Sequence, residues 1–564
     1  MAEETKLWDA VPGYDFDEKI DVPAMNSWFL DATHCVPPWT PLFSWFWNRY
    51  CSHGLKYAAA TLSIPSCKGW EMRYKDGGCY MAFHIIKDDE LVKKREVKFQ
   101  EALEPWFENF DGLWAGYIQE LLAIYEKLKA IDLDKATNIE LLYHNYELIN
   151  TCRRMWEIHF LGMYASYSAW LMLEALCKKH FGLNDQSPEF LAMLRGFDNK
   201  VYQVDRRLWE FGQLGIDIGL ADIFLENEDK DILPKLDETD RGRQFIKEFY
   251  DFLEVEGWRM VRMNDLNVPY WLEDPTQPIG VIRNFIAWRC DYMLDRMRAQ
   301  LETERKKAVA LMLQRVPHKD KERFQKLLGL AQKASPYSEE HDLYCELYAH
   351  ALLRRGYLAI GKRLADVGTI KQANDVSFLN PDEIERVMLV PEAHDLRYIV
   401  DRRRAVWEEA NKRGNPLIFT RRNDVEEAIA QDMILSNDVV AMKVSVGEIP
   451  KVTPGLGADF FGLRGSPGVA EGPARVIVHY ADLGSVQPGE ILVCPGVNPA
   501  WAPAFGVING VVADSGAALS HTAIIAREYG IPMLGNIQGV STKIKTGQKI
   551  RVDGNEGALY IINK

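Results

Sequence analysis

A run of small residues that ends in a single histidine constrains the C-terminal part of this chain more than any other stretch. Residues 514–528 begin Asp-Ser-Gly-Ala-Ala-Leu-Ser-His and continue in an apolar helical pattern that includes Ala523 and Ile524. Serine is a favoured helix N-cap, so Ser520 predicts a helix whose first turn contains His521. Free backbone N–H groups at a helix start bind anions, and the positive helix end favours a neutral, nucleophilic imidazole. We therefore expect His521 to be able to hold a phosphoryl group; the alternative is a histidine that only begins a helix.

The residues around His521 resemble the phosphohistidine, or swivelling, domain of the phosphoenolpyruvate-utilising enzymes. Ser520-His521, Ala526-Arg527 and Gly530-Ile531-Pro532 stand in the order typical of that family. Further matching segments lie at residues 465–472, 488–493, 546–548 and 552–557. Ala517-Ala518 departs from the family, which usually has a glycine and a bulkier residue there. The resemblance implies that His521 is the phosphohistidine and that Ser520, Thr522 and Arg527 complete the catalytic group.

Length and composition fit a protein of several globular domains. The 564 residues exceed the ~100–200 residues of a single domain. A net charge of −14 argues against a nucleic-acid or anionic-membrane partner. Nine cysteines without a Cys-x-x-Cys pair favour reduced thiols, and the N-terminus has no apolar signal core. The most apolar helical run, residues 161–176, is shorter than the ~20 residues that a membrane span needs. We expect a cytoplasmic protein.

Hydrophobic periodicity predicts an α+β multidomain protein, in which a large, mostly α-helical substrate domain precedes a small α/β swivelling phosphohistidine domain. Steps of three and four residues between apolar side chains predict helices. These cover residues 96–130, 140–179, 188–214, 241–255, 282–313, 337–368 and 391–413, with an acidic linker at 226–240 and a hairpin at 74–86.

The second half of the prediction rests on a change in character after residue 443. Gly447, Pro450, Pro454, Gly455 and Gly457 predict a linker, residues 444–460. Short apolar strands follow at 474–479, 490–494, 510–513, 549–552 and 558–562. The predicted domains are 1–95 for an aromatic loop and hairpin region, 96–443 for the helical substrate-binding domain, and 461–564 for the swivelling domain.

Aromatic residues crowd a proline-containing stretch near the N-terminus, where Trp39, Trp45 and Trp47 follow His34 closely. Pro41 predicts a helix start. The aromatic side chains form either a core or the wall of an acceptor pocket, and His34 would bring a polar group to that wall. Residues 28–42 resemble the opening loop of the substrate domain in rifampicin phosphotransferases, and more closely the large subunits of phenylphosphate synthases.

Polar residues on two predicted helices allow the same two interpretations. Arg153 and His159 lie on one helix, and His350 and Arg354 lie on another. They either pack and hydrogen-bond between helices or orient a phenolic hydroxyl and neutralise an incoming phosphoryl group. No His, Asp and Glu set has the spacing of a metal site, so we expect no metal ion bound by this chain.

The sequence contains no GxxxxGK[ST] loop and no stretch that resembles an ATP-binding domain. The resemblance therefore implies a phosphohistidine-carrying, acceptor-binding subunit of a dikinase-type phosphotransferase. A separate ATP-binding subunit would bind ATP and Mg²⁺, and ATP would yield AMP and phosphate. The expected acceptor is phenol or a related aromatic alcohol. The alternatives are a subunit of a rifampicin-type drug phosphotransferase and a non-catalytic phosphocarrier or regulatory protein.

Overall fold

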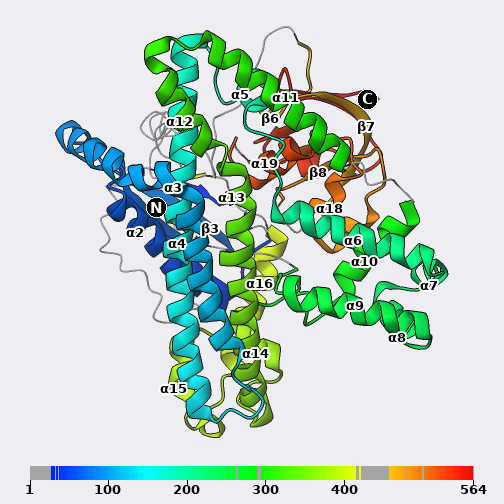
Figure 1. The fold of residues 1–564 in the computed structure, drawn as a ribbon. Coiled ribbons are helices and arrows are strands. Elements are labelled where there is room, and N and C mark those ends of the chain that lie inside the picture. The colour runs from blue at the N-terminus through cyan, green and yellow to red at the C-terminus, as the bar shows by residue number, and fades with distance from the viewer. Residues whose placement is uncertain are drawn as a thin grey trace. The chain divides into compact units, whose positions relative to one another are not determined.

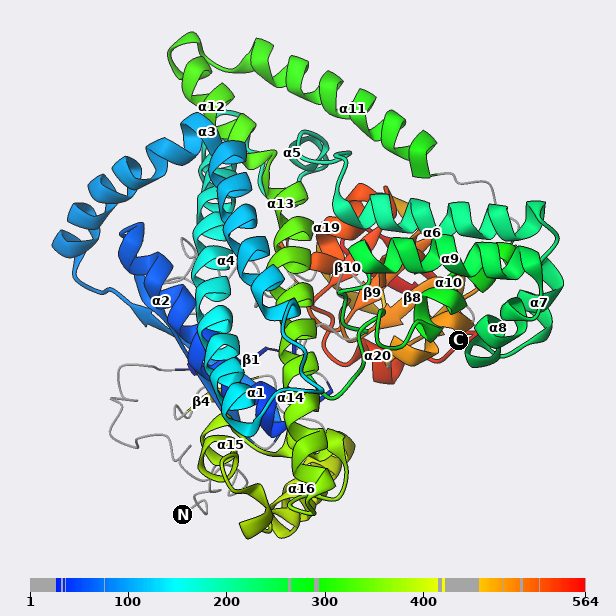
Figure 2. The same ribbon diagram turned by 60° about the horizontal axis from the view of Figure 1, so that its bottom comes forward.

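The computed structural model describes residues 27–31, 34–35, 37–75, 77–261, 265–288, 294–413, 418–420, 456–478, 480–497, 501–516 and 518–562. The chain divides into two compact units. The first unit comprises Met1–Ala165, Met263–Val268 and Tyr344–Val439, and the second comprises Ser166–Arg262, Pro269–Leu343 and Val440–Lys564. Figures 1 and 2 show the elements of both. Most of the predicted linker, residues 444–455, lies outside the described residues.

A four-stranded antiparallel sheet of order β2-β3-β1-β4 organises part of the first unit. Its strands are β1 (Ser27–Leu30), β2 (Cys67–Lys75), β3 (Gly78–Ile85) and β4 (Ile418–Thr420). Strands β2 and β3 form the hairpin expected around Gly77, although β2 begins earlier in the chain than predicted. Gly77 has a φ of 88°, and a Cβ there would lie 2.5 Å from the Cβ of Ala410, so only glycine fits this turn.

Long helices build the rest of the first unit. Asp88 caps α3 (Asp89–Lys129) by accepting hydrogen bonds from the N–H groups of Glu90 and Leu91, and the helix kinks at Asn109, shortly after Pro105. Helix α4 (Asn138–Phe181) begins in the first unit and ends in the second. The other elements are α1 (Pro41–Phe46), η2 (Trp47–Cys51), α2 (Ser52–Thr61), α14 (Tyr348–Asp366), η5 (Ala373–Phe378), α15 (Pro381–Val387), η6 (Pro391–Ala393) and α16 (Arg397–Arg413). Pro41 begins a helix, as predicted.

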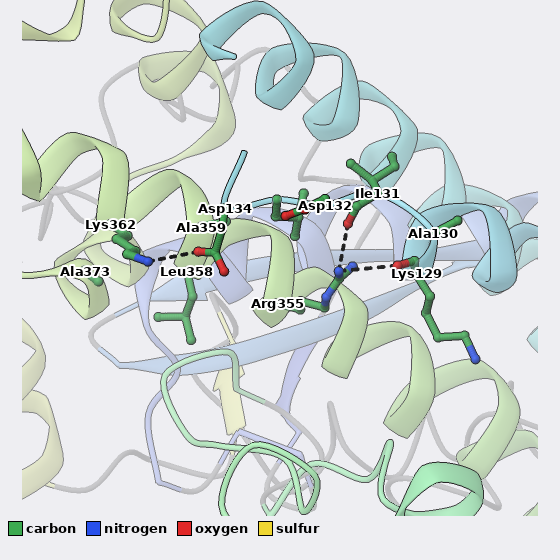
Figure 3. A pocket seen from close by; sticks show the side chains of 11 residues that line it. Lys129, Ala130, Ile131, Asp132, Asp134, Arg355, Leu358, Ala359, Lys362 and Ala373 are labelled. Atoms are coloured by element: carbon green, nitrogen blue, oxygen red, sulfur yellow. Dashed lines mark hydrogen bonds and ion pairs between the residues drawn. The ribbon is translucent and has the colours of Figure 1, made fainter. Parts of the chain in front are cut away.

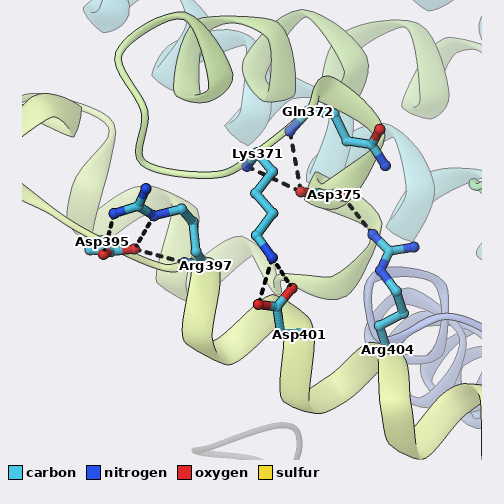
Figure 4. Close-up of polar contacts among 7 residues, drawn as sticks. All are labelled: Lys371, Gln372, Asp375, Asp395, Arg397, Asp401 and Arg404. Atoms are coloured by element: carbon cyan, nitrogen blue, oxygen red, sulfur yellow. Dashed lines mark hydrogen bonds and ion pairs between the residues drawn. The ribbon is translucent and has the colours of Figure 1, made fainter.

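A charged network joins η5 to α16 (Figure 4). Asp375 accepts hydrogen bonds from the backbone N–H groups of Lys371 and Gln372 and pairs with Arg404 of α16. The ammonium group of Lys371 contacts both carboxylate oxygens of Asp401 at 2.7 Å. Because Asp375 is buried and receives several donors, this network holds η5 against α16 and is part of the fold rather than an open binding surface.

Ten further helices lie in the part of the second unit that the structure describes upstream of its sheet. They are α5 (Pro188–Ala192), α6 (Lys200–Asp217), α7 (Ala221–Glu226), α8 (Asp229–Asp237), α9 (Asp240–Glu256), α10 (Thr276–Trp288), α11 (Leu294–Arg315), η3 (His318–Asp320), α12 (Lys321–Ala331) and α13 (Ala334–His341). The π-helix η4 (Asp342–Leu347) begins in the second unit and ends in the first.

Three local predictions differ from these helices. The predicted acidic linker, 226–240, contains helix α8, because Ile232 and Leu236 are buried in the apolar core beneath its charged face. The single helix predicted at 188–214 is divided into α5 and α6, and Asn199 caps the second by accepting from the N–H of Tyr202. The helix predicted at 282–313 is described as α10 and α11, with residues 289–293 outside the described part.

An eight-stranded mixed sheet forms the C-terminal part of the second unit. Its order is β5-β12-β11-β7-β8-β9-β10-β6, and β7 through β10 run parallel. The strands are β5 (Phe460–Phe461), β6 (Leu463–Ser466), β7 (Val469–Val476), β8 (Ile491–Cys494), β9 (Gly510–Ala513), β10 (Met533–Gly535), β11 (Lys549–Asp553) and β12 (Ala558–Ile561). The connecting helices are η8 (Tyr480–Ser485), α18 (Ala502–Phe505), α19 (His521–Glu528) and α20 (Val540–Lys543).

Apolar clusters lie on both faces of the parallel strands, which explains why β8 and β9 are continuous apolar runs. The fold class predicted from the sequence, a large helical region followed by a small α/β domain, is confirmed. The short strands β5, β6 and β10 were not predicted. Within the described residues, no helix combines the length and the apolar character required to cross a membrane.

Candidate functional site

His521 is the first residue of α19, as the sequence predicted. Ser520 adopts an extended conformation, and its hydroxyl oxygen accepts a hydrogen bond from the N–H of Ala523 at 3.4 Å. Gly530, with a φ of 64°, ends the helix, where Ile531 donates its N–H to the carbonyl of Ala526. These caps hold the imidazole at the N-terminal end of a short helix, and the side chain is 9% exposed.

Two other residues predicted beside His521 hold α19 in place. The hydroxyl of Thr522 accepts a hydrogen bond from the N–H of Val497 at 3.1 Å. The guanidinium of Arg527 donates to the carbonyl of Gly465 in β6 at 2.9 Å, and burial lowers the pKa of Arg527 to about 10. These contacts position the helix; a direct catalytic role for either residue stays a prediction.

Two polar side chains lie beside His521, Ser338 of α13 and Asp342 of η4. Nδ1 of His521 lies 3.1 Å from Oδ2 of Asp342 and 3.3 Å from the hydroxyl oxygen of Ser338. The other carboxylate oxygen of Asp342 lies 3.2 Å from Nε2 of His341. The contact between Nδ1 and Ser338 has hydrogen-bond geometry, whereas Asp342 lies at ion-pair distance. In the tautomer that carries its proton on Nδ1, the neutral imidazole of His521 has its lone pair on Nε2, which makes that atom the nucleophile.

Sequence reasoning missed Ser338 and Asp342 because they lie far upstream of His521 in the chain. It also predicted no metal ion, on the ground of spacing along the sequence. The structure nevertheless brings His341, Asp342 and His521 close enough that they could hold an ion. The adjacent pair His341-Asp342 was the only available signal, and it does not by itself point to His521.

The far end of α19 has a second set of contacts in the same unit. The carboxylate of Glu528 accepts hydrogen bonds at 2.8 Å from the N–H groups of Gly196 and Phe197, and at 2.6 Å from the hydroxyl of Ser335. Burial raises the pKa of Glu528, and burial together with the charge of Glu528 raises the pKa of Glu339 to about 8. Both ends of α19 therefore contact the segment 334–342.

Aromatic rings stack beside this second set. Tyr202 of α6 lies parallel to Tyr529, with ring centroids 4.8 Å apart. The hydroxyl of Tyr529 donates to Asp205 at 3.3 Å. Burial raises the pKa of Asp205 to about 7, although the Tyr529 hydrogen bond acts in the opposite direction.

The predicted acceptor-binding residues lie in the first unit, where three of them meet. Nδ1 of His34 lies 2.7 and 2.9 Å from the two carboxylate oxygens of Asp31. The ring centroid of His34 lies 5.2 Å from that of Trp47, and the ring centroids of Trp47 and Trp39 are 4.9 Å apart. Burial opposes protonation of His34, but the charge and hydrogen bond of Asp31 raise its pKa. This pair has the form of a histidine oriented by a carboxylate.

His159 and His350 extend the same cluster. Trp156 connects them. Its ring centroid lies 4.9 Å from that of Trp47, 4.8 Å from that of His159 and 6.4 Å from that of His350. Nε2 of His159 lies 3.1 Å from the carboxylate of Glu346. Burial, with the nearby charges of His34 and His350, holds the pKa of His159 well below its usual value.

The remaining predicted residues lie elsewhere in the first unit. Trp45 donates its indole N–H to Asp382 and carries the guanidinium of Arg49 over its ring. Arg153 is exposed. Arg354 donates to the carbonyl of Leu266 at 2.7 Å and to the side chain of Asn374. The structure thus brings together His34, Trp39, Trp47, His159 and His350, and leaves Trp45, Arg153 and Arg354 outside this cluster.

A surface cavity of about 660 Å³ lies where α3 ends beside α14 (Figure 3). Its lining includes Lys129, Asp134, Arg355 and Lys362 but not the predicted site residues. Arg355 donates to the carbonyls of Leu128 and Ile131, and Lys362 pairs with Asp134. These cations therefore cap a helix and form an ion pair within the fold.

Comparison with protein families agrees with the geometry around His521. Residues 486–557 match the mobile domain of PEP-utilising enzymes. The chain carries the mobile domain of the phosphoenolpyruvate-utilising enzymes. Residues 157–339 match the fourth domain of rifampicin phosphotransferase. His521 thus belongs to the mobile domain, and the segment similar to rifampicin phosphotransferase lies upstream of it.

Individual relatives of this mobile-domain protein include two phosphotransferases of Bacillus subtilis. The chain is 28% identical to an uncharacterized phosphotransferase, YvkC, over 67% of its own length and 44% of the relative. It is 28% identical to the rifampicin phosphotransferase over 59% of its length and 36% of that protein. It is also 28% identical to the chondramide synthase cmdD of Chondromyces crocatus, over 95% of its length and 14% of that protein. The chain therefore spans less than half the length of these relatives.

Proposed function

We propose that this chain carries a phosphoryl group on His521 and delivers it to an acceptor alcohol, as part of a dikinase-type phosphotransferase. The observation that carries the proposal is the placement of His521 within the mobile domain. It begins a capped helix, and its Nδ1 is 3.1 Å from the carboxylate of Asp342. A proton on Nδ1, beside Ser338 and Asp342, leaves Nε2 as the nucleophile, while the helix N–H groups favour the phosphoryl oxygens.

The reaction has two half-reactions. In the first, Nε2 of His521 attacks the β-phosphorus of ATP and the bond to the AMP oxygen breaks, while water cleaves the bond to the γ-phosphate, so that ATP and water yield AMP, phosphate and phospho-His521. A separate ATP-binding subunit would bind ATP and Mg²⁺. In the second, the acceptor oxygen attacks phosphorus, the P–N bond breaks, and its electron pair returns to Nε2. A base must take the proton of the acceptor hydroxyl, which for a phenol has a pKa near ~10.

We propose phenol or a related aromatic alcohol as the acceptor and His34 as the base. Support comes from the cluster of aromatic rings around His34 and from Asp31, which orients the imidazole and raises its pKa. A rifampicin-type drug acceptor is the second candidate, favoured by the match of residues 157–339 to the rifampicin phosphotransferase fourth domain. A phosphocarrier or regulatory protein without an acceptor alcohol is the third.

Labelling with β-labelled ATP, in the presence of the ATP-binding subunit, tests the first half-reaction. Wild-type chain should take up label that is acid-labile and base-stable, as a phosphoimidazole is. His521→Ala should take up none, whereas His180→Ala should label normally because His180 lies outside the site and pairs with Asp320. Label retained by the His521 variant would refute the assignment.

Transfer from the isolated phosphorylated chain tests the second half-reaction. Loss of label that requires phenol supports the proposed acceptor, and loss that requires a rifamycin instead supports the drug phosphotransferase. If the chain keeps its label in the presence of either compound, the phosphocarrier is favoured.

A variant of the proposed base separates chemistry from packing. His34→Ala should leave charging of His521 unchanged and slow transfer to phenol by ~10²–10⁴-fold, the usual contribution of a general base. His53→Ala is the matched control, because His53 also pairs with a carboxylate in the first unit, Glu157 at 2.9 Å. If His34→Ala lowers only protein stability, the aromatic cluster is core and His34 is not the base.

A further inference from the structure

We propose that His341, Asp342 and His521 form a binding site for a first-row divalent transition-metal ion, of which Zn²⁺ is the best match. The three side chains are buried, and one ligand atom from each lies within 4.8 Å of the others. Two of the residues lie where α13 meets η4, and the third begins α19. The site is separate from any ion that accompanies ATP, and its existence does not depend on the proposed phosphotransfer. An ion on Nδ1 of His521 takes the place of the proton on that atom, so the metal-bound histidine and the nucleophilic histidine are alternative states of the side chain.

The distances fit a metal centre. Oδ1 of Asp342 lies 3.2 Å from Nε2 of His341, and Oδ2 lies 3.1 Å from Nδ1 of His521. Ligand atoms bonded to Zn²⁺ at ~2.0–2.2 Å in a tetrahedron are roughly 3.3 Å apart. Each oxygen of the carboxylate therefore stands near this separation from one of the two imidazole nitrogens.

The hydrogen bonding of His341 points in the same direction. Its Nδ1 lies 2.9 Å from the carbonyl oxygen of Tyr337, which can only accept, so Nδ1 carries a proton. In a neutral ring, Nε2 then presents its lone pair to the carboxylate of Asp342. Two acceptors this close need a cation between them, either a second proton on His341 or a metal ion. Metal-bound histidines typically donate their other ring N–H to a carbonyl or carboxylate, as His341 does.

The chemistry of the ligands selects the ion. Two imidazole nitrogens and one carboxylate suit Zn²⁺ and its first-row neighbours, whereas Mg²⁺ and Ca²⁺ prefer oxygen ligands. Three protein ligands leave a fourth position for water. The hydroxyl of Ser338 lies 3.3 Å from Nδ1 of His521. Because the ion would join α19 to α13, it should also stabilise the folded chain.

The test uses the full chain, stripped with a chelator and titrated with Co²⁺ and then with Zn²⁺. We expect one ion per chain, a Co²⁺ absorption spectrum typical of nitrogen and oxygen ligands, and a higher melting temperature on Zn²⁺ addition. His341→Gln and Asp342→Asn each remove a direct ligand. They should weaken binding by more than the ~10–100-fold that loss of an outer-shell partner costs, and they should abolish the shift in melting temperature.

His180→Gln is the matched control. Nε2 of His180 lies 3.1 Å from the carboxylate of Asp320, the same type of pair, but in the described part of the chain no third ligand joins it. Its affinity for the ion should equal that of wild type.

Absence of ion binding by wild type, or wild-type affinity in both ligand variants, would overturn the proposal and make His341 an imidazolium paired with Asp342. If the buried substitutions prevent folding, X-ray absorption of the Zn²⁺-loaded wild type decides. Two imidazole ligands and a carboxylate support the site, and any other ligand set rejects it.

Discussion

Two histidines of this chain are paired through Nδ1 with a buried aspartate, yet their surroundings differ. His34 and Asp31 lie three residues apart in the first unit, among indole rings. His521 and Asp342 come from distant segments of the second unit, and their neighbours are Ser338 and His341. A buried His–Asp pair therefore does not by itself define a catalytic centre. The helix start and the mobile-domain match distinguish His521, whereas His34 depends on whether its aromatic neighbours form a pocket or a core.

Removing an indole from the first cluster should have the largest effect. Trp39 is 0% exposed, contacts Trp47 and Phe43, and donates its N–H to the carbonyl of His34. Trp39→Ala should therefore lower the free energy of unfolding by ~3–5 kcal/mol, measured by chemical denaturation. Tyr398→Ala, at a 72% exposed position of α16, should change it by less than ~0.5 kcal/mol. A loss below ~1 kcal/mol for Trp39→Ala would mean that the rings leave room for a ligand.

A titrating group in the second unit should have a pH-dependent effect, which amounts to about 1.4 kcal/mol for each pH unit. The pKa of Asp205 is raised from 3.8 to about 7 by burial, so the folded state holds its proton more tightly than the unfolded state. The stability that this group contributes is present below pH 3.8 and is lost as the pH rises to about 7. The free energy of unfolding falls by about 1.4 kcal/mol per pH unit inside that window, and this group does not change it further at higher pH.

Asp205→Asn removes this titration. In urea titrations at successive pH values, the unfolding free energy of the variant should fall less steeply between pH 5 and 7 than that of wild type, by about 1.4 kcal/mol per pH unit. The buried Glu339 and Glu528 contribute equally to both proteins. An unchanged slope in the variant would show that Asp205 ionises normally in the folded chain.

Local sequence patterns predicted most of the elements in both units, since capping and periodicity act over a few residues. Ser520 caps α19 as predicted, and β9 has the predicted bounds. The error at α8 shows the limit of this reasoning. Its charged residues are typical of a linker, but two apolar side chains bury one face and make it a helix.

The candidate site was predictable only where it is contiguous. Ser520, His521 and the helix that follows them are adjacent, so sequence reasoning placed them correctly on the fold. Asp342 reaches His521 only through the packing of α13 against α19, and no local pattern encodes that contact. Among the aromatic residues, periodicity could not tell that Trp47 faces His34 while Trp45 faces Asp382.

The smallest expected effect concerns the cap before His521, and it asks whether that helix start does more than stabilise the fold. Ser520→Ala removes the acceptor for the N–H of Ala523 and should cost about 1 kcal/mol of unfolding free energy. Thr239→Ala is matched to it, because Thr239 caps α9 by accepting from the N–H of Gly242 at 2.9 Å and lies outside the site. Both variants should lose similar stability, but only Ser520→Ala should also slow labelling of His521, since an altered helix start misplaces the imidazole and the N–H groups that receive the phosphoryl oxygens. Equal labelling rates in the two variants would show that Ser520 is a structural cap alone, and would leave Asp342 as the residue that orients His521.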